Sequence, residues 1–163
     1  MIAPNLDRLV VPLITGGNRV AFYTALLVGN DNPGFRFLLA HSHPEIDYVM
    51  ASFHPEAELD EAAYFEKIRM LKAAGHRVFL RLVGHPARLD RLEELSELCR
   101  GLDICFYPTT LISKNFPDAY SEDQKGHLRK QFSSLSQYVQ LEGGESADRQ
   151  HHSMHKCTYT LAW

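Results

Sequence analysis

The chain has 163 residues, of which 45% are hydrophobic and 23% charged, and its formal net charge at pH 7 is -3. These values are typical of a globular domain with its own core, and they argue against a nucleic-acid partner. No apolar run is long enough to predict a membrane span. The 3 cysteines are widely spaced, which argues against a disulfide framework, so we expect a cytoplasmic protein.

The first half of the chain alternates between predicted strands and predicted helices. Residues 19–28 (RVAFYTALLV) are rich in β-branched and aromatic side chains, which predicts a strand. Asn32, followed by a proline, predicts the start of a short helix. A second strand is predicted over residues 47–53, and a helix follows over residues 59–74 with Asp60 as its expected N-cap.

The second half continues this alternation. Residues 77–83 (RVFLRLV) predict a strand, and Pro86 begins a helix with leucines at three-residue steps. Residues 103–107 predict a fourth strand. A capping box that begins at Ser121 predicts another helix, and residues 138–141 predict a last strand.

The alternation predicts an α/β fold. Strands separated by helices of this length form right-handed crossovers and a parallel sheet. We expect helices on both faces of the sheet, because the strands are continuous apolar runs. The predicted β/α domain covers residues 1–144, and the polar segment 145–163 is expected to be a weakly ordered tail.

Candidate functional residues follow the predicted strands, because function in a parallel β/α sheet collects at the carboxyl ends of its strands. Arg81 is the most informative, since it interrupts an apolar strand and a buried guanidinium needs an anionic partner. That partner is either a bound carboxylate or phosphate, or an acid of the protein such as Glu142. The residues at these ends are Ser52, His54, Glu56, Arg81, Gly84, His85, Tyr107, Thr109, Thr110 and Glu142.

Two histidines stand directly after strands and beside prolines. His54 and His85 are either contacts of a ligand or groups that cap the following loop and helix, and the capping role is the more common one. As a functional hypothesis, His54, His85 and Glu142 are the predicted substrate-binding residues.

A further cluster lies in the predicted tail. Imidazole and thiolate groups at short spacing are ligands that zinc prefers, but ligands so close together rarely close a tetrahedral site. Metal binding or assembly through this tail is one alternative function. The candidate ligands are His151, His152, His155 and Cys157.

An ordered series of segments resembles the radical SAM enzymes that carry a cysteine-rich C-terminal extension. The resemblance covers residues 4–144 and implies a (β/α)6 partial barrel of the TIM type that uses S-adenosylmethionine and a 4Fe-4S cluster. It implies that Ser52 and Arg81 contact the cofactor's ribose or carboxylate, and that Cys105 and Tyr107 lie near its adenine. The segments are VMASFHPE (49–56), FEKIRMLKAAG (65–75), RVFLRLVGHP (77–86) and GLDICFYP (101–108).

The chain departs from this family in its cysteines. It contains no C-x3-C-x2-C motif, and thiolates are needed to hold the cluster. We therefore expect a fragment or truncated form of a radical SAM enzyme that carries no cluster and is not catalytic alone. Its substrate is not predicted. Half a barrel would leave the strand at residues 19–28 with an unpaired edge, which predicts marginal stability or oligomerisation.

The alternative is a self-contained α/β module that binds a small anionic ligand. Ser52, Arg81 and His85 would contact that ligand, and the predicted strands would form a flavodoxin-like sheet.

Overall fold

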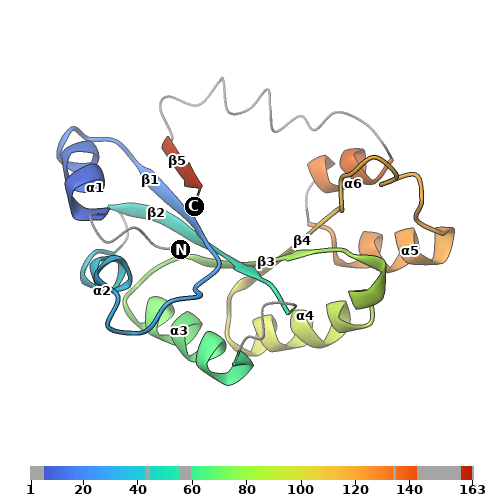
Figure 1. Cartoon of the computed structure of the whole chain (residues 1–163), viewed down its shortest axis with the longest axis horizontal. Helices are drawn as coiled ribbons and strands as arrows, with labels where there is room; N and C mark the ends of the chain where they lie inside the picture. Colours follow the sequence, from blue (N-terminus) through green and yellow to red (C-terminus); the bar gives the residue numbers. More distant parts are fainter. Residues whose placement is uncertain (1–5, 43–44, 56–59, 134, 143–158, 163) are drawn as a thin grey trace. The chain divides into compact units, whose positions relative to one another are not determined.

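The computed structural model describes residues 6–42, 45–55, 60–133, 135–142 and 159–162. Helices and strands alternate along most of this part of the chain, as the sequence predicts (Figure 1). In chain order the elements are α1 (Leu6–Thr15), β1 (Val20–Thr24), α2 (Pro33–Ala40), β2 (Ile46–Phe53), α3 (Glu61–Ala73), β3 (Val78–Val83), the 3-10 turn η1 (Pro86–Arg88), α4 (Arg91–Gly101), β4 (Cys105–Thr109), α5 (Glu122–Gln131), α6 (Leu135–Leu141) and β5 (Tyr159–Ala162).

The strands form a parallel sheet in the order β4-β3-β2-β1-β5. β1 pairs in parallel with β2 on one side and with β5 on the other. The predicted α/β class with a parallel sheet is therefore confirmed. Strands β1 to β4 follow one another across the sheet without a reversal, which differs from the flavodoxin-like order of the alternative hypothesis.

The chain divides within β3 into two compact units. Unit 1 consists of Met1–Phe79 with Cys157–Trp163, and unit 2 consists of Leu80–Lys156. Unit 1 therefore holds β1, β2, β5 and the first three helices, and unit 2 holds β4 and the last three helices.

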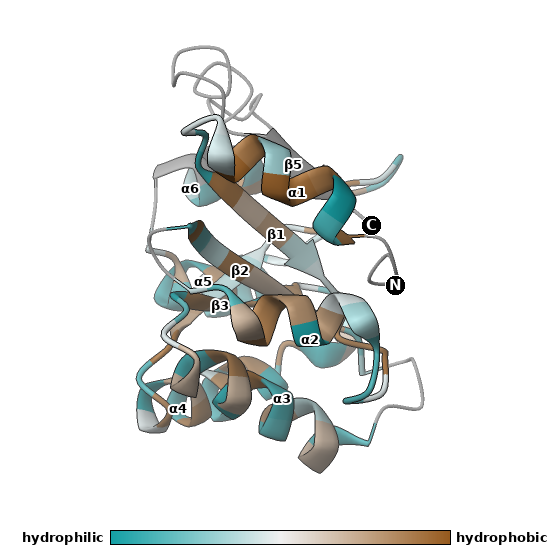
Figure 2. Cartoon of the chain, turned by 90° about the vertical axis from the view of Figure 1, so that its left-hand side faces the viewer, coloured by the Kyte–Doolittle hydropathy of each residue, from teal (hydrophilic) through white to brown (hydrophobic). Residues whose placement is uncertain are grey.

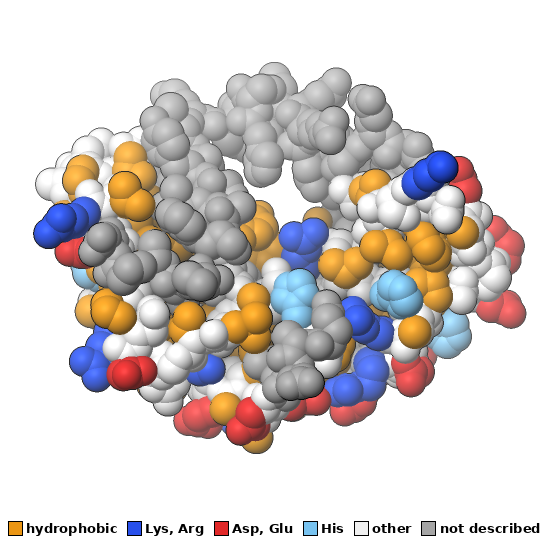
Figure 3. All heavy atoms as spheres, viewed as in Figure 1, with side chains coloured by type: hydrophobic (Ala, Val, Ile, Leu, Met, Phe, Trp, Pro, Cys, Tyr) orange, Lys and Arg blue, Asp and Glu red, His pale blue; other side chains and the backbone are white. Residues whose placement is uncertain are grey.

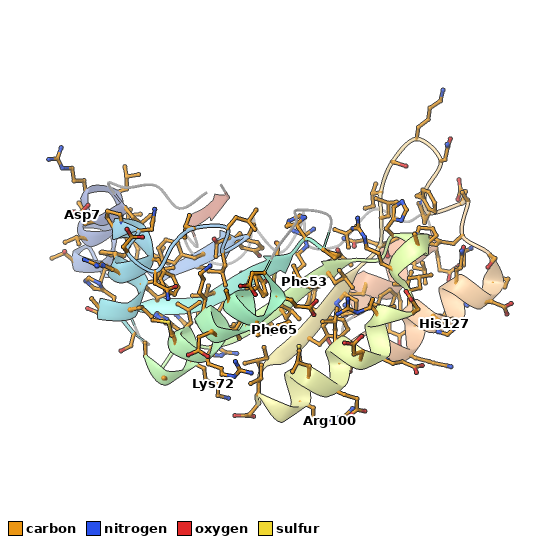
Figure 4. All side chains as sticks on the ribbon, turned by 60° about the horizontal axis from the view of Figure 1, so that its bottom comes forward. Asp7, Phe53, Phe65, Lys72, Arg100 and His127 are labelled. Carbon is orange, nitrogen blue, oxygen red and sulfur yellow. The ribbon has the colours of Figure 1, made fainter. Side chains whose placement is uncertain are left out.

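The core of unit 1 lies between its strands and α3. Asp60 caps α3 as predicted, because its Oδ1 accepts a hydrogen bond from the Ala63 amide at 3.1 Å. The Phe53 ring at the end of β2 packs against the α3 rings of Tyr64 and Phe65, with centroids 5.2 Å and 5.8 Å away (Figure 4). Since β1 to β3 follow in order, right-handed crossovers place α2 and α3 on one face. Figure 2 shows that α2 is the more hydrophobic of these two helices.

β1 is shorter than the predicted strand over residues 19–28. It ends at Thr24, and Leu26 then adopts a left-handed conformation with φ 52°. The edge predicted to be unpaired is instead occupied by β5, so that prediction is wrong. β5 (Tyr159–Ala162) also forms within the segment predicted to be a weakly ordered tail, because it finds its partner in the first strand of the sheet.

β3 is not buried equally on both faces, contrary to the prediction for the sheet. In unit 2, its residues Leu80 and Leu82 are buried, whereas Arg81 and Val83, which alternate with them, are partly exposed. This alternation follows from the two-residue period of a strand with one covered face.

The helices of unit 2 depart from the sequence prediction in two places. The helix predicted from Pro86 divides into η1 and α4, which begins at Arg91. Residues 138–141 belong to α6 instead of a strand, so that prediction is wrong. Gln137 and Leu141 are four residues apart and both buried, which is the spacing of one helix face. The capping box between Ser121 and Gln124 is confirmed.

The surface of unit 2 carries exposed apolar side chains. Ile112 is 65% exposed and Tyr138 is 40% exposed. Figure 3 shows hydrophobic side chains gathered over this part of the molecule. None of the helices in the described ranges has the length and hydropathy of a transmembrane segment.

Candidate functional site

The carboxyl ends of β3 and β4 lie side by side in unit 2. The Gly84 amide donates a hydrogen bond to the Thr109 carbonyl at 2.7 Å, and Thr109 Oγ1 donates to the Leu82 carbonyl at 3.5 Å. These bonds bring together the residues that follow or end two neighbouring strands. Arg81 and Thr110, both predicted strand-end residues, therefore belong to one region of unit 2.

Arg81 lies within β3 on the less buried side of the strand. Its Nε is buried and has no hydrogen-bond partner among the described residues, and no ion pair of Arg81 occurs there either. Glu142, the acid that the sequence suggested as its partner, instead pairs with Arg129, with 2.5 Å between Nη2 and Oε1. This pairing lowers the pKa of Glu142. The Arg81 guanidinium thus has unused donors within the described part of unit 2.

The pairing of β3 with β4 indicates which predicted residue lies beside Arg81. In a parallel ladder, an amide bonds to the carbonyl of the residue that precedes its cross-strand neighbour. The bond from Gly84 to Thr109 therefore pairs Gly84 with Thr110. If the pairing continues from Gly84 and Thr110 towards the amino ends of the strands without a shift, Arg81 is the cross-strand neighbour of Tyr107. Their two side chains then lie on the same face of the sheet.

Thr110 is the second polar group of this region that is left unsatisfied. It follows β4 directly and is 5% exposed, and its Oγ1 has no hydrogen-bond partner within the described residues. A buried donor or acceptor without a partner costs about 1–3 kcal/mol. A ligand that bonds to such a group recovers part of this cost.

Tyr120 fixes the geometry of the strand ends. Its hydroxyl donates to the Gly84 carbonyl at 2.6 Å and accepts from the Leu111 amide at 2.9 Å. Burial raises the pKa of Tyr120, and the bond from Leu111 acts in the opposite direction. A Cβ at Gly84 would lie 2.6 Å from Leu128 Cδ2, so α5 packs closely on the end of β3. No sequence pattern indicated Tyr120, because its partner Gly84 lies 36 positions earlier along the chain.

Gln137 supports β4 from α6. Its Nε2 donates to the Pro108 carbonyl at 2.6 Å, and its Oε1 accepts from the Ser133 amide at 2.8 Å. The side chain is buried, and its bond to Pro108 is shielded from water. Sequence reasoning missed Gln137, because it lies directly before residues 138–141, which the sequence predicts to be a strand.

Two other predicted residues of unit 2 have different surroundings. Cys105 is exposed and is the first residue of β4, so it lies at the amino end of the strand. Burial, with Cys105 as a smaller cause, raises the pKa of Cys99 to about 12. His85 is exposed, and its Nδ1 accepts a hydrogen bond from the Ala87 amide at 3.2 Å, as the capping interpretation expects.

The remaining predicted residues lie in unit 1 or outside the described ranges. Ser52 near the end of β2 and His54 after it are partly exposed. A common anionic group contacted by Ser52 and Arg81 stays a prediction, because the two residues belong to different units. The candidate metal ligands His151, His152, His155 and Cys157, together with Glu56, lie outside the described residues. Among those that are described, no group of three or more His, Cys, Asp or Glu side chains is arranged to hold a metal ion.

Comparisons of the chain with models of protein families, with curated proteins and with solved structures found no match. The resemblance to radical SAM enzymes therefore stays a prediction.

Proposed function

We propose that the chain binds a small anionic ligand at the carboxyl ends of β3 and β4, with Arg81 as the residue that neutralises its charge. The observation that carries this proposal is the buried Nε of Arg81, which has no partner in the described part of the chain. Removing a guanidinium donor from water is unfavourable unless an acceptor replaces the water. A carboxylate or phosphate fits best, because the planar guanidinium binds two oxygens at once.

The surroundings of Arg81 support a preformed site. Tyr120 bonds to Gly84 and Leu111, and Gln137 bonds to Pro108, so side chains fix both strand ends. A rigid site loses less entropy when it binds a ligand. The Thr110 hydroxyl, buried and without a partner among the described residues, is a second polar group at these strand ends.

The radical SAM resemblance supplies a second, more specific candidate for the ligand. S-adenosylmethionine carries a carboxylate. The resemblance implies that Ser52 and Arg81 contact its ribose or carboxylate, and that Cys105 and Tyr107 lie near its adenine. The sequential order of β1 to β4 supports this candidate, because consecutive strands are also neighbours in a β/α barrel. In this form of the proposal the chain binds the cofactor but performs no radical chemistry alone, since it contains no C-x3-C-x2-C motif.

The test is calorimetric titration of the full chain with inorganic phosphate, acetate and S-adenosylmethionine in separate experiments. Arg81→Ala is expected to weaken binding about 10-fold or more, because a charge-assisted hydrogen bond is worth about 1.5–3 kcal/mol. Arg81→Lys is expected to retain part of the affinity, since it keeps the charge and loses the planar fork. Arg100→Ala is the matched control, because Arg100 is 68% exposed and pairs with Glu97.

Equal affinities of Arg81→Ala and Arg100→Ala for every bound anion would contradict the proposal, as would the absence of binding to the unmodified chain. Binding of phosphate or acetate without binding of S-adenosylmethionine would retain the general proposal and reject the more specific one.

A further inference from the structure

Unit 1 contains a buried lysine that the sequence did not single out. Lys67 lies on the inward face of α3, beside the buried Ile68, and is 9% exposed. Its Nζ donates to the Leu26 carbonyl at 3.1 Å. Within the described ranges Lys67 forms no ion pair with a carboxylate. Lysines are rarely buried without an anionic partner, because a carbonyl dipole replaces only part of the lost hydration.

A buried hydroxyl bonds to the amide of the same backbone residue. Thr24, the last residue of β1, is 4% exposed, and its Oγ1 accepts a hydrogen bond from the Leu26 amide at 3.0 Å. A hydroxyl that accepts a bond still has its own hydrogen to donate. Among the described residues no acceptor takes this hydrogen. Lys67 and Thr24 therefore both have unused donors close to Leu26.

Both donors belong to side chains that bond to Leu26, and Leu26 has an unusual backbone conformation. Leu26 has φ 52°, a left-handed conformation that side chains other than glycine rarely adopt. Its amide donates a hydrogen bond to Thr24 Oγ1, and its carbonyl accepts one from Lys67 Nζ, so two hydrogen bonds stabilise this conformation. The chain thereby turns at the carboxyl end of β1, where parallel β/α sheets commonly bind their ligands.

We propose that the carboxyl end of β1 binds the phosphate group of a small molecule, with Lys67 Nζ and Thr24 Oγ1 as its donors. An ammonium group has three donors, and the Leu26 carbonyl uses one of them. A compact ammonium charge suits a phosphate, whose oxygens accept bonds from several directions. This site lies entirely in unit 1 and does not depend on the anion site proposed for Arg81.

A purely structural role for Lys67 makes a different prediction. If Lys67 only holds the Leu26 carbonyl, phosphate added to the folded chain will leave the surroundings of Leu26 unchanged. If Lys67 and Thr24 also bind phosphate, the Leu26 amide will respond, because it donates to Thr24 Oγ1.

The experiment is a titration of the isotope-labelled full chain with inorganic phosphate, followed by amide NMR at constant ionic strength. In the unmodified chain we expect saturable shifts of the Thr24 and Leu26 resonances at millimolar phosphate. Lys67→Gln is expected to weaken this response at least about tenfold, since it removes the charged donor. Lys72→Gln, which removes the same charge from the same helix, is expected to leave it unchanged. The Arg81→Ala variant should retain the response, which separates this site from the one in unit 2.

A second pair of variants keeps the test decisive if Lys67→Gln does not fold. Thr24→Val removes the hydroxyl at nearly constant volume and is expected to weaken the response several-fold, whereas Thr24→Ser keeps the hydroxyl and should retain it. The proposal is overturned if phosphate leaves Thr24 and Leu26 unshifted in the unmodified chain. It is also overturned if the shifts are equal in every variant that folds.

Discussion

The two units each place a cationic side chain near the end of a strand, but the partners of these two cations differ. In unit 1, Lys67 reaches from α3 to the Leu26 carbonyl and holds the chain where it leaves β1. In unit 2, the Nε of Arg81 is buried and, within the described residues, has no partner. A cation that satisfies a buried carbonyl contributes to folding, whereas one with an unsatisfied donor reduces stability. The comparison separates a cation that supports the fold with one of its donors from a cation whose buried donor has no protein partner within the described residues.

The units also differ in the side-chain hydrogen bonds that hold the backbone just after the strands. In unit 1 the left-handed Leu26 is held by Thr24 and Lys67, whereas in unit 2 one tyrosine bridges two backbone segments. Because Tyr120 satisfies both a carbonyl and an amide, we expect it to contribute more to stability than Lys67 does.

Tyr120→Phe is expected to have the largest effect. It leaves the Gly84 carbonyl and the Leu111 amide without their partner, which should lower the free energy of unfolding by about 2–4 kcal/mol. The measurement is urea denaturation of the full chain. Tyr138→Phe is the matched control. Tyr138 is exposed, and its hydroxyl forms one hydrogen bond within the described residues, to the Arg129 carbonyl, so a loss below about 1 kcal/mol is expected. Equal losses in the two variants would show that Tyr120 does not hold the strand ends.

Lys67→Met is expected to have an intermediate effect. The methionine keeps most of the apolar stem but leaves the Leu26 carbonyl without its donor, so we expect a loss of about 1–3 kcal/mol. Lys72→Met on the same helix is the control, with an expected change within about 0.5 kcal/mol. An increase in the stability of Lys67→Met would mean that burying the ammonium costs more than its bond to Leu26 returns, and the contrast between the units would disappear.

The features that the sequence predicted correctly are those with a local cause. The caps at Asn32, Asp60 and Ser121 each bond to a backbone amide three residues later, so the residue types alone indicate them. The strands β2, β3 and β4 coincide closely with apolar runs of the expected length. Arg81 was identified as a candidate because a single charge in such a run is visible without a structure.

The features that the sequence did not reveal depend on partners far away along the chain. Lys67 bonds to a residue 41 positions earlier, and Tyr120 to one 36 positions earlier. Neither bond leaves a periodic signal, and both residue types are common on surfaces. The same limit applies to β5, which pairs with β1 from the other end of the chain. The stretch at residues 138–141 is too short for its period to distinguish a strand from a helix.

Arg81→Met is expected to have the smallest effect on the free energy of unfolding. It tests most directly the comparison between Arg81 and Lys67. The methionine fills much of the same apolar space, and in unit 2 no described hydrogen bond or ion pair of Arg81 is lost, so the free energy of unfolding should stay within about 0.5 kcal/mol or rise. Breaking a buried ion pair would instead cost about 3–5 kcal/mol, because the remaining charge stays buried without its partner. A loss of that size would show that a protein acid already neutralises Arg81. An unchanged stability together with weaker anion binding would show that Arg81 serves the ligand and contributes little to the fold.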